Sequence, residues 1–170
     1  MKKSRARARA ITKHDIHQRF IEQMAKELGA ITASAKASFA AATDDAHRAE
    51  HKYDTFKLEE SFLARGQAKR VKELTDALES LQMLPVDDLP EGSPVQFGAL
   101  IRLKAKNGTV STLLFGSAAG GETLVVEGEE ITVVTAQSPL GQAVLGKTAG
   151  ETFEMKIGRD LQAFAIISVV

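Results

Sequence analysis

The stretch from Ala40 to Lys52 gathers polar side chains that could do chemistry, and it contains no large apolar residue. It carries three acids, two histidines and two bases. His47 and His51 are four residues apart with Glu50 between them, so on a helix they could bind a metal ion together. Short motifs of this kind also occur by chance in exposed polar segments. We therefore interpret the stretch mainly as an exposed polar turn.

Two long segments with helical periodicity flank this polar stretch. In each of them apolar residues recur mostly three or four positions apart, which predicts one apolar stripe along a helix. Two such stripes that face each other form the seam of a coiled coil. The stripe residues are Ile16, Phe20, Met24, Leu28, Ile31, Ala35 and Phe39 before the polar stretch, and Leu58, Phe62, Val71, Leu74, Leu78 and Leu81 after it.

The two helices are expected to fold back on each other as an antiparallel coiled coil over residues 14–84, with the polar stretch at the exposed tip. We predict a first helix from about His14 to Ala42 and a second from near Asp45 to Leu81, with Thr43 or Asp44 as its N-cap. Acids in a first turn also suit the helix dipole. An arm of about 30–35 residues is roughly 50 Å long, so this hairpin should project well beyond a small domain.

A change of pattern follows the second helix. The segment from Pro85 to Pro94 contains three prolines and a glycine, which predicts a linker over residues 85–94. After it the periodicity changes to two, which is typical of strands. Asn107-Gly108 predicts a tight hairpin turn, and Ser138-Pro139 predicts a short capped helix. The expected strands are Phe97–Leu103, Val110–Phe115, Leu124–Val126, Ile131–Val134, Thr152–Ile157 and Leu161–Val169. The predicted fold is α+β, with a small antiparallel sheet wrapped on one short helix over residues 95–170.

Composition excludes several classes of site. The chain of 170 residues has no Cys, which excludes disulfides, thiolate metal sites and a cysteine nucleophile, and suits a reducing cytoplasm. No apolar run reaches the roughly 18 residues that a membrane span requires, so we expect a soluble, cytoplasmic protein with no membrane contact. Residues 1–13 carry six bases and no acid. We expect this arm to be a solvated tail, with a weak contact to nucleic acid or to an acidic protein surface as the alternative.

A motif in the second half connects the chain to a known family. The run Ser138-Pro139-Leu140-Gly141-Gln142-Ala143-Val144-Leu145-Gly146-Lys147, followed by Gly150-Glu151, resembles the signature of the bacterial Gre transcript-cleavage factors. The order of a coiled coil and a β domain also fits, and the residues around Glu50 and Tyr53 look closer to a shorter Gre-like subgroup with a divergent tip. The resemblance implies that the β domain is FKBP-like and that it binds RNA polymerase, through Ser138, Pro139, Leu140 and Gly141.

The resemblance also implies a mechanism. Gre factors pass the coiled coil down the secondary channel of RNA polymerase, where tip carboxylates help to hold a catalytic magnesium ion. In this sequence Asp44, Asp45 and Glu50 are the available carboxylates, and carboxylate oxygens are the ligands that magnesium prefers. The protein would then have no cofactor of its own, apart from magnesium shared with the polymerase, and would not be an enzyme by itself.

The tip departs from the family pattern, and this leaves the activity open. Counting back from Tyr53, Ala46 and Ala49 stand where the cleavage factors carry Asp and Glu. We expect the protein either to stimulate transcript cleavage or only to occupy the channel, and the second reading is slightly favoured. A rival from another class is a coiled-coil interaction module that self-associates and does not act on polymerase. Prolyl isomerisation is rejected, because its pocket needs an aromatic cage and the β domain has four Phe but no Tyr or Trp.

Overall fold

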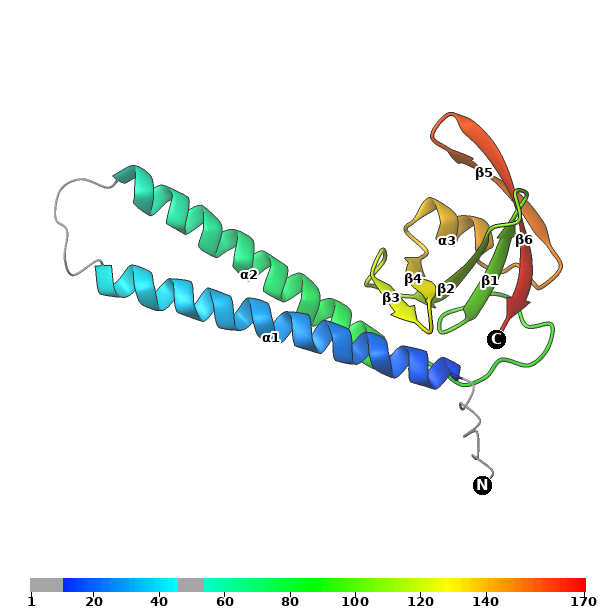
Figure 1. Ribbon diagram of the computed structural model, residues 1–170, viewed down its shortest axis with the longest axis horizontal. Helices are drawn as coiled ribbons and strands as arrows, with labels where there is room; N and C mark the ends of the chain where they lie inside the picture. The colour runs from blue at the N-terminus through cyan, green and yellow to red at the C-terminus, as the bar shows by residue number, and fades with distance from the viewer. Residues whose placement is uncertain (1–10, 46–53) are drawn as a thin grey trace, which may run out of the picture.

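The computed structural model of the protein describes residues 11–45 and 54–170, and the side chains of residues 11–37 and 65–170. The basic arm up to residue 10 lies outside the described residues. Within these ranges a long helical hairpin is followed by a six-stranded sheet and one short helix (Figure 1). The predicted α+β fold class is confirmed. Figure 1 shows the sheet beside one end of the hairpin, while the other end projects far from it.

The hairpin consists of α1 (Lys13–Asp45) and α2 (Asp54–Gln82), which lie antiparallel along each other. α1 starts in a capping box. Thr12 Oγ1 accepts a hydrogen bond from the Asp15 backbone N–H at 3.1 Å, and Asp15 Oδ2 accepts one from the Thr12 backbone N–H at 2.9 Å. Because the first N–H groups of a helix lack intrahelical partners, these bonds set the start of α1 locally, close to the predicted His14.

Asp45 belongs to the first helix, and within the described residues the second helix begins at Asp54, so the prediction that the second helix starts near Asp45 is wrong. α1 instead continues through Asp45, because Ala40-Ala41-Ala42 is a strong helix former and neither Gly nor Pro follows it to stop the helix. Asp44 and Asp45 therefore belong to the first helix rather than cap the second. A residue inside the first helix cannot also cap the start of the second, so these two residues do not have the predicted capping role.

The sheet contains β1 (Leu100–Ala105), β2 (Val110–Gly116), β3 (Thr123–Val126), β4 (Glu129–Thr135), β5 (Thr152–Ile157) and β6 (Asp160–Val169). Their order is β3-β4-β2-β1-β6-β5, so β3 and β5 form the two edges. The predicted turn between β1 and β2 is confirmed. Asn107 Oδ1 accepts a hydrogen bond from the Thr109 backbone N–H at 3.0 Å, and Gly108 has a φ of 90°, which favours glycine.

One pair of strands differs from the predicted antiparallel sheet. β2 and β4 run parallel, whereas the other four pairs are antiparallel. The chain crosses from β2 to the edge as β3 and then turns back as β4 beside β2. β4 takes the inner position because it is buried on both faces, with Ile131 and Val133 on one face and Val134 on the other. In contrast, Thr123 and Val125 of β3 are exposed.

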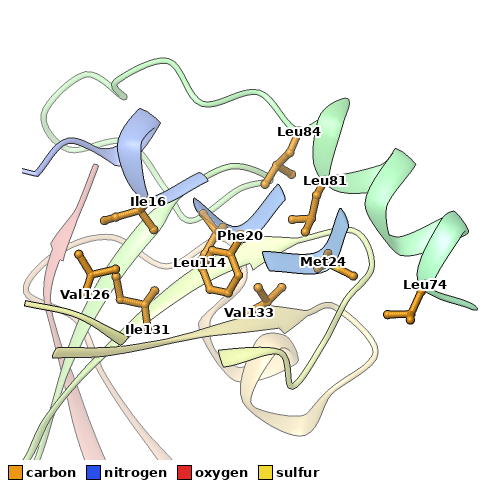
Figure 2. Packing of buried hydrophobic residues seen from close by; sticks show 10 residues of the cluster. All are labelled: Ile16, Phe20, Met24, Leu74, Leu81, Leu84, Leu114, Val126, Ile131 and Val133. Atoms are coloured by element: carbon orange, nitrogen blue, oxygen red, sulfur yellow. The ribbon is translucent and has the colours of Figure 1, made fainter. Parts of the chain in front are cut away.

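A helical element covers each face of the sheet. On one face, α3 (Pro139–Val144) packs near Ile101, Phe115 and Ile166. On the other face lies the base of the hairpin, and Figure 2 shows side chains of both long helices meeting side chains of the sheet. This second cluster comprises Ile16, Phe20, Met24, Leu74, Leu81, Leu84, Leu114, Val126, Ile131 and Val133. The base of the hairpin therefore belongs to the same hydrophobic core as the sheet.

The predicted stripes are buried most completely near the sheet. Five of their residues are buried: Ile16, Phe20, Met24, Leu74 and Leu81. Five more are half-buried, namely Leu28, Ile31, Ala35, Val71 and Leu78. The remaining three, Phe39, Leu58 and Phe62, lie outside the residues whose side chains the structure describes. The stripe thus serves as a helix–helix seam and, at the base, also as a contact with the sheet.

The segment predicted as a linker, residues 85–94, is held near its start by two contacts, one with the sheet domain and one with the hairpin. A Cβ on Gly98 would lie 1.6 Å from the Pro85 carbonyl oxygen, and Gly98 has a φ of 84°, so this approach requires glycine. On the other side, Lys13 Nζ donates a hydrogen bond to the Asp87 carbonyl oxygen at 2.5 Å. The connection between the hairpin and the sheet is therefore anchored to both of them.

Candidate functional site

The end of α1 and the start of α2 both lie at the end of the hairpin farthest from the sheet (Figure 1). Asp44 and Asp45 are the last two residues of α1, and Asp54 is the first residue of α2. Glu50 and both tip histidines lie outside the described residues, so their predicted metal-binding role stays a prediction. Among the residues that the structure does describe, no three His, Asp or Glu side chains are placed to hold a metal ion. The backbone nevertheless brings three acidic positions to the far end of the hairpin.

Two residues with polar ends, Lys13 and His17, are buried at the base of the hairpin. His17 Nε2 donates a hydrogen bond to the Leu81 carbonyl oxygen at 2.6 Å, which links α1 to the last turn of α2. That carbonyl belongs to the group that a helix end leaves without intrahelical partners. The His17 Nδ1 atom has no hydrogen-bond partner among the described residues. Burial lowers the pKa of Lys13, and the nearby charges of Asp88 and Asp87 oppose this change.

Arg70 of α2 links the two helices of the hairpin to each other and to the loop before β3. Its guanidinium forms ion pairs with Glu27 of α1 at 2.9 Å and with Glu122, in the loop before β3, at 3.8 Å. The hydrogen bond to Glu27 raises the pKa of Arg70. Nearby, Gln23 Nε2 donates a hydrogen bond to the Thr123 carbonyl oxygen at 2.9 Å. Exposed ion pairs contribute only about 0–1 kcal/mol each to stability, so we infer that these contacts act mainly on the direction in which the hairpin points.

The α3 motif is explained in large part by local structure. Ser138 is the predicted N-cap of α3: its Oγ accepts a hydrogen bond from the Gly141 backbone N–H at 3.0 Å and donates one to the Thr135 carbonyl oxygen at 2.9 Å. Pro139 occupies the first turn, where its missing N–H costs nothing. Gly141 is buried, and a Cβ there would lie 1.9 Å from the Thr135 carbonyl oxygen. Ser138 and Gly141 therefore fix α3 to the end of β4.

Leu140 lies at the edge of a groove of about 710 Å³ on the face of the sheet that α3 partly covers. The apolar lining of this groove, here called the α3 groove, also includes Leu103, Leu113, Val134 and Phe164. Charged residues, among them Arg102, Glu129 and Glu130, line it as well. Of the four predicted docking residues, only the exposed Pro139 and the half-buried Leu140 offer side chains to a partner.

Sequence reasoning missed both the buried base of the hairpin and the α3 groove. For the base a signal was present, because Ile21 stands beside Ile16, Phe20 and Met24 and widens the apolar stripe of α1. A wide stripe is typical of a helix packed in a globular core, whereas a coiled-coil seam is narrower. For the groove no local signal existed, because its lining comes from strands that are far apart in the sequence.

Comparisons with known proteins give the following findings. No protein-family model matches the sequence, and no curated protein matches it. A solved structure of the transcription factor Gfh1 is similar to this chain, with 18% identity, a TM-score of 0.40, and coverage of 88% of this chain and 92% of that one. Gfh1 of Thermus aquaticus gives 16% identity, a TM-score of 0.37, and coverage of 87% and 92%. The prokaryotic transcription elongation factor GreA/GreB of Nitrosomonas europaea gives 19% identity, a TM-score of 0.34, and coverage of 60% and 90%.

The helices also bear on the predicted absence of a membrane span. Within residues 11–45 and 54–170, none of the helices combines the length and the apolar character that crossing a bilayer requires.

Proposed function

We propose that the protein is a Gre-like transcription factor that binds RNA polymerase, inserts the far end of its hairpin into the secondary channel and modulates elongation. The observation that carries this proposal is the shape of the hairpin. α1 has 33 residues, which makes it about 50 Å long at 1.5 Å per residue. Its far half projects away from the sheet (Figure 1). A narrow rod of this length can reach a site inside a large partner that a globular domain cannot enter.

The anchored base of the hairpin supports the same proposal. A probe must keep its direction relative to the surface that docks, and here both helices share a core with the sheet. The contacts of Arg70 and Gln23 add polar ties between the hairpin and the edge of the sheet. Docking of the sheet domain would therefore also aim the hairpin.

For the docking surface we propose Pro139, Leu140 and the α3 groove. The groove combines apolar walls with charged residues, which suits an amphipathic segment of a partner protein. Ser138 and Gly141 would contribute indirectly, by holding α3 in place. The docking role predicted for the whole motif is thus proposed here for two of its four residues.

At the far end of the hairpin we propose occupation of the channel rather than stimulation of cleavage. Two alanines, Ala46 and Ala49, stand where the cleavage factors carry acids. Asp44 and Asp45 lie within α1, so neither stands at a position where the cleavage factors carry these acids. The protein would then act without a cofactor and without catalytic activity of its own.

The docking proposal is tested by capturing purified RNA polymerase of the source organism on the immobilised full-length chain. Leu140→Asp places a carboxylate in the apolar wall of the groove. Losing the burial of one leucine costs about 1.5–3 kcal/mol, so polymerase affinity should fall at least about tenfold. Leu145→Asp is the matched control, because Leu145 lies at the other end of α3 and is 45% exposed; it should bind like the wild type.

Two results would contradict this proposal in different ways. Equal loss of binding in Leu140→Asp and Leu145→Asp, with both proteins folded, would remove the docking surface from the groove. A wild-type chain that does not retain polymerase at all would favour the interaction module that acts without polymerase. The full chain is needed for the test, because without the hairpin the sheet would expose Leu114, Ile131 and Val133.

A further inference from the structure

β5 is an edge strand, and the part of the chain that the structure describes places no strand on its outer side. The Ile166 backbone N–H donates to the Glu151 carbonyl oxygen at 2.9 Å, so at Glu151 the backbone bonds toward β6. Antiparallel strands alternate between residues that bond inward and residues that point outward. This alternation turns the backbone groups of Thr152, Glu154 and Lys156 away from β6. Such a row of outward N–H and C=O groups can pair with another strand.

The sequence of β5 is self-complementary about its middle residue. Met155 is flanked by Glu154 on one side and Lys156 on the other, and then by Phe153 and Ile157. When the strand is read from Ile157 back to Phe153, apolar residues occupy the same positions, and the acidic and the basic residue have changed places. We propose that β5 pairs with β5 of a second copy of this chain, antiparallel and centred on Met155, so that the two sheets become continuous.

The charges select this register among the possible ones. An antiparallel pair across a twofold axis must place outward-pointing residues opposite each other. Centred on Met155, each Glu154 lies directly opposite Lys156 of the second copy, which makes two attractive pairs. A shift of the centre to Glu154 would place two glutamates opposite each other, and a shift to Lys156 would do the same with two lysines. Opposite charges stabilise a cross-strand pair, whereas like charges weaken it.

The other face of the strand fits the same register. Glu154 and Lys156 are exposed, while Phe153 and Met155 are half-buried and Ile157 is 43% exposed. In the proposed pair Met155 lies opposite Met155 of the second copy, and each Phe153 lies opposite Ile157. The pairing would therefore cover apolar surface on one face while it pairs charges on the other. Because it joins only one short strand from each copy, the interface is smaller than the roughly 1,000 Å² of a stable complex, and the dimer should form only at high concentration.

The proposal is tested by sedimentation velocity of the full-length chain over a wide range of concentration. The wild type should shift from monomer to dimer as concentration rises. Glu154→Lys and Lys156→Glu should each weaken dimerisation by about tenfold or more, because each replaces attractive pairs with repulsive ones. An equimolar mixture of the two variants should dimerise, since every pair between unlike chains is again a lysine opposite a glutamate. The doubly reversed chain, with both substitutions, should also regain the wild-type dimer.

Matched controls are Glu91→Lys and Lys26→Glu, which reverse exposed charges away from β5 and should dimerise as the wild type does. Circular dichroism confirms that each variant is folded. A wild type that stays monomeric at every concentration would overturn the proposal, and the charges of β5 would then only protect the edge. A dimer that ignores both single reversals, or a mixture that fails to associate, would place the interface elsewhere. None of these outcomes depends on whether the protein binds polymerase.

Discussion

Replacing Phe20 with alanine should destabilise the hairpin and the sheet together. Phe20 is 0% exposed and belongs to the cluster that joins α1 and α2 to the sheet (Figure 2). A buried Phe→Ala change costs about 3–5 kcal/mol, because apolar burial is lost and a cavity remains. For a chain of 150–250 residues each kcal/mol lowers Tm by about 2–4 °C. The expected decrease in Tm is therefore about 6–20 °C.

The assay is thermal denaturation by circular dichroism, combined with hydrogen exchange of peptides from α1, β2 and β4. Exchange should accelerate in all three elements, because the cavity lies between them. Val125→Ala is the control, since Val125 is 65% exposed on β3 and its loss should change stability by no more than about 0.5 kcal/mol. Faster exchange in α1 with unchanged exchange in β2 and β4 would refute the reasoning. The hairpin would then be an independent unit that merely rests on the sheet.

Three further predictions concern single contacts and the tip. Gly141→Ala should lower the free energy of unfolding, measured by urea denaturation, by about 1–3 kcal/mol, because the new Cβ meets the Thr135 carbonyl oxygen. Gly29→Ala is the control: its Cβ meets nothing within 4 Å at an exposed helix position, so this change should raise the free energy of unfolding by about 0.5–1 kcal/mol. Hydrogen bonds from the Thr148 backbone N–H and hydroxyl lower the pKa of Glu151, so Glu151→Gln should be less stable than the wild type near neutral pH. This difference in stability should vanish as pH falls through the lowered pKa. A difference that stays constant at all pH values would argue against a charged Glu151. In backtracked polymerase complexes the wild-type protein should give no transcript cleavage above that of polymerase alone, and the double variant Asp44→Asn with Asp45→Asn should inhibit the polymerase as the wild type does. Strong transcript cleavage by the wild type that the double variant loses would show that these carboxylates hold the magnesium ion.

Features that depend on neighbouring residues were determined by the sequence itself. The two stripes predicted both helices because helix periodicity is a local property. The Asn107-Gly108 turn and the Ser138-Pro139 helix start were predicted for the same reason, since a turn or a cap is completed within three or four residues. The change from helical to strand periodicity after Pro94 likewise predicted the α+β class.

The boundary of the second helix shows where local reasoning failed. Thr43 and Asp44 have the residue types of an N-cap, but residue type alone does not distinguish a helix start from a helix interior, and Ala40-Ala41-Ala42 before them favours continuing the helix. α1 therefore includes Asp44 and Asp45. The positions of Asp44 and Asp45 within the candidate tip site changed as a result.

Only the tertiary structure decided how these elements come together. The parallel pairing of β2 with β4 depends on burying both faces of β4, and the α3 groove depends on strands distant in sequence. The same is true of Gly141, whose need for glycine arises from the approach of α3 to β4. At the hairpin base, Phe20 could have packed equally well in a helix–helix seam. It packs against the sheet as well, because apolar burial has no direction and is satisfied by whichever surfaces the fold brings into contact.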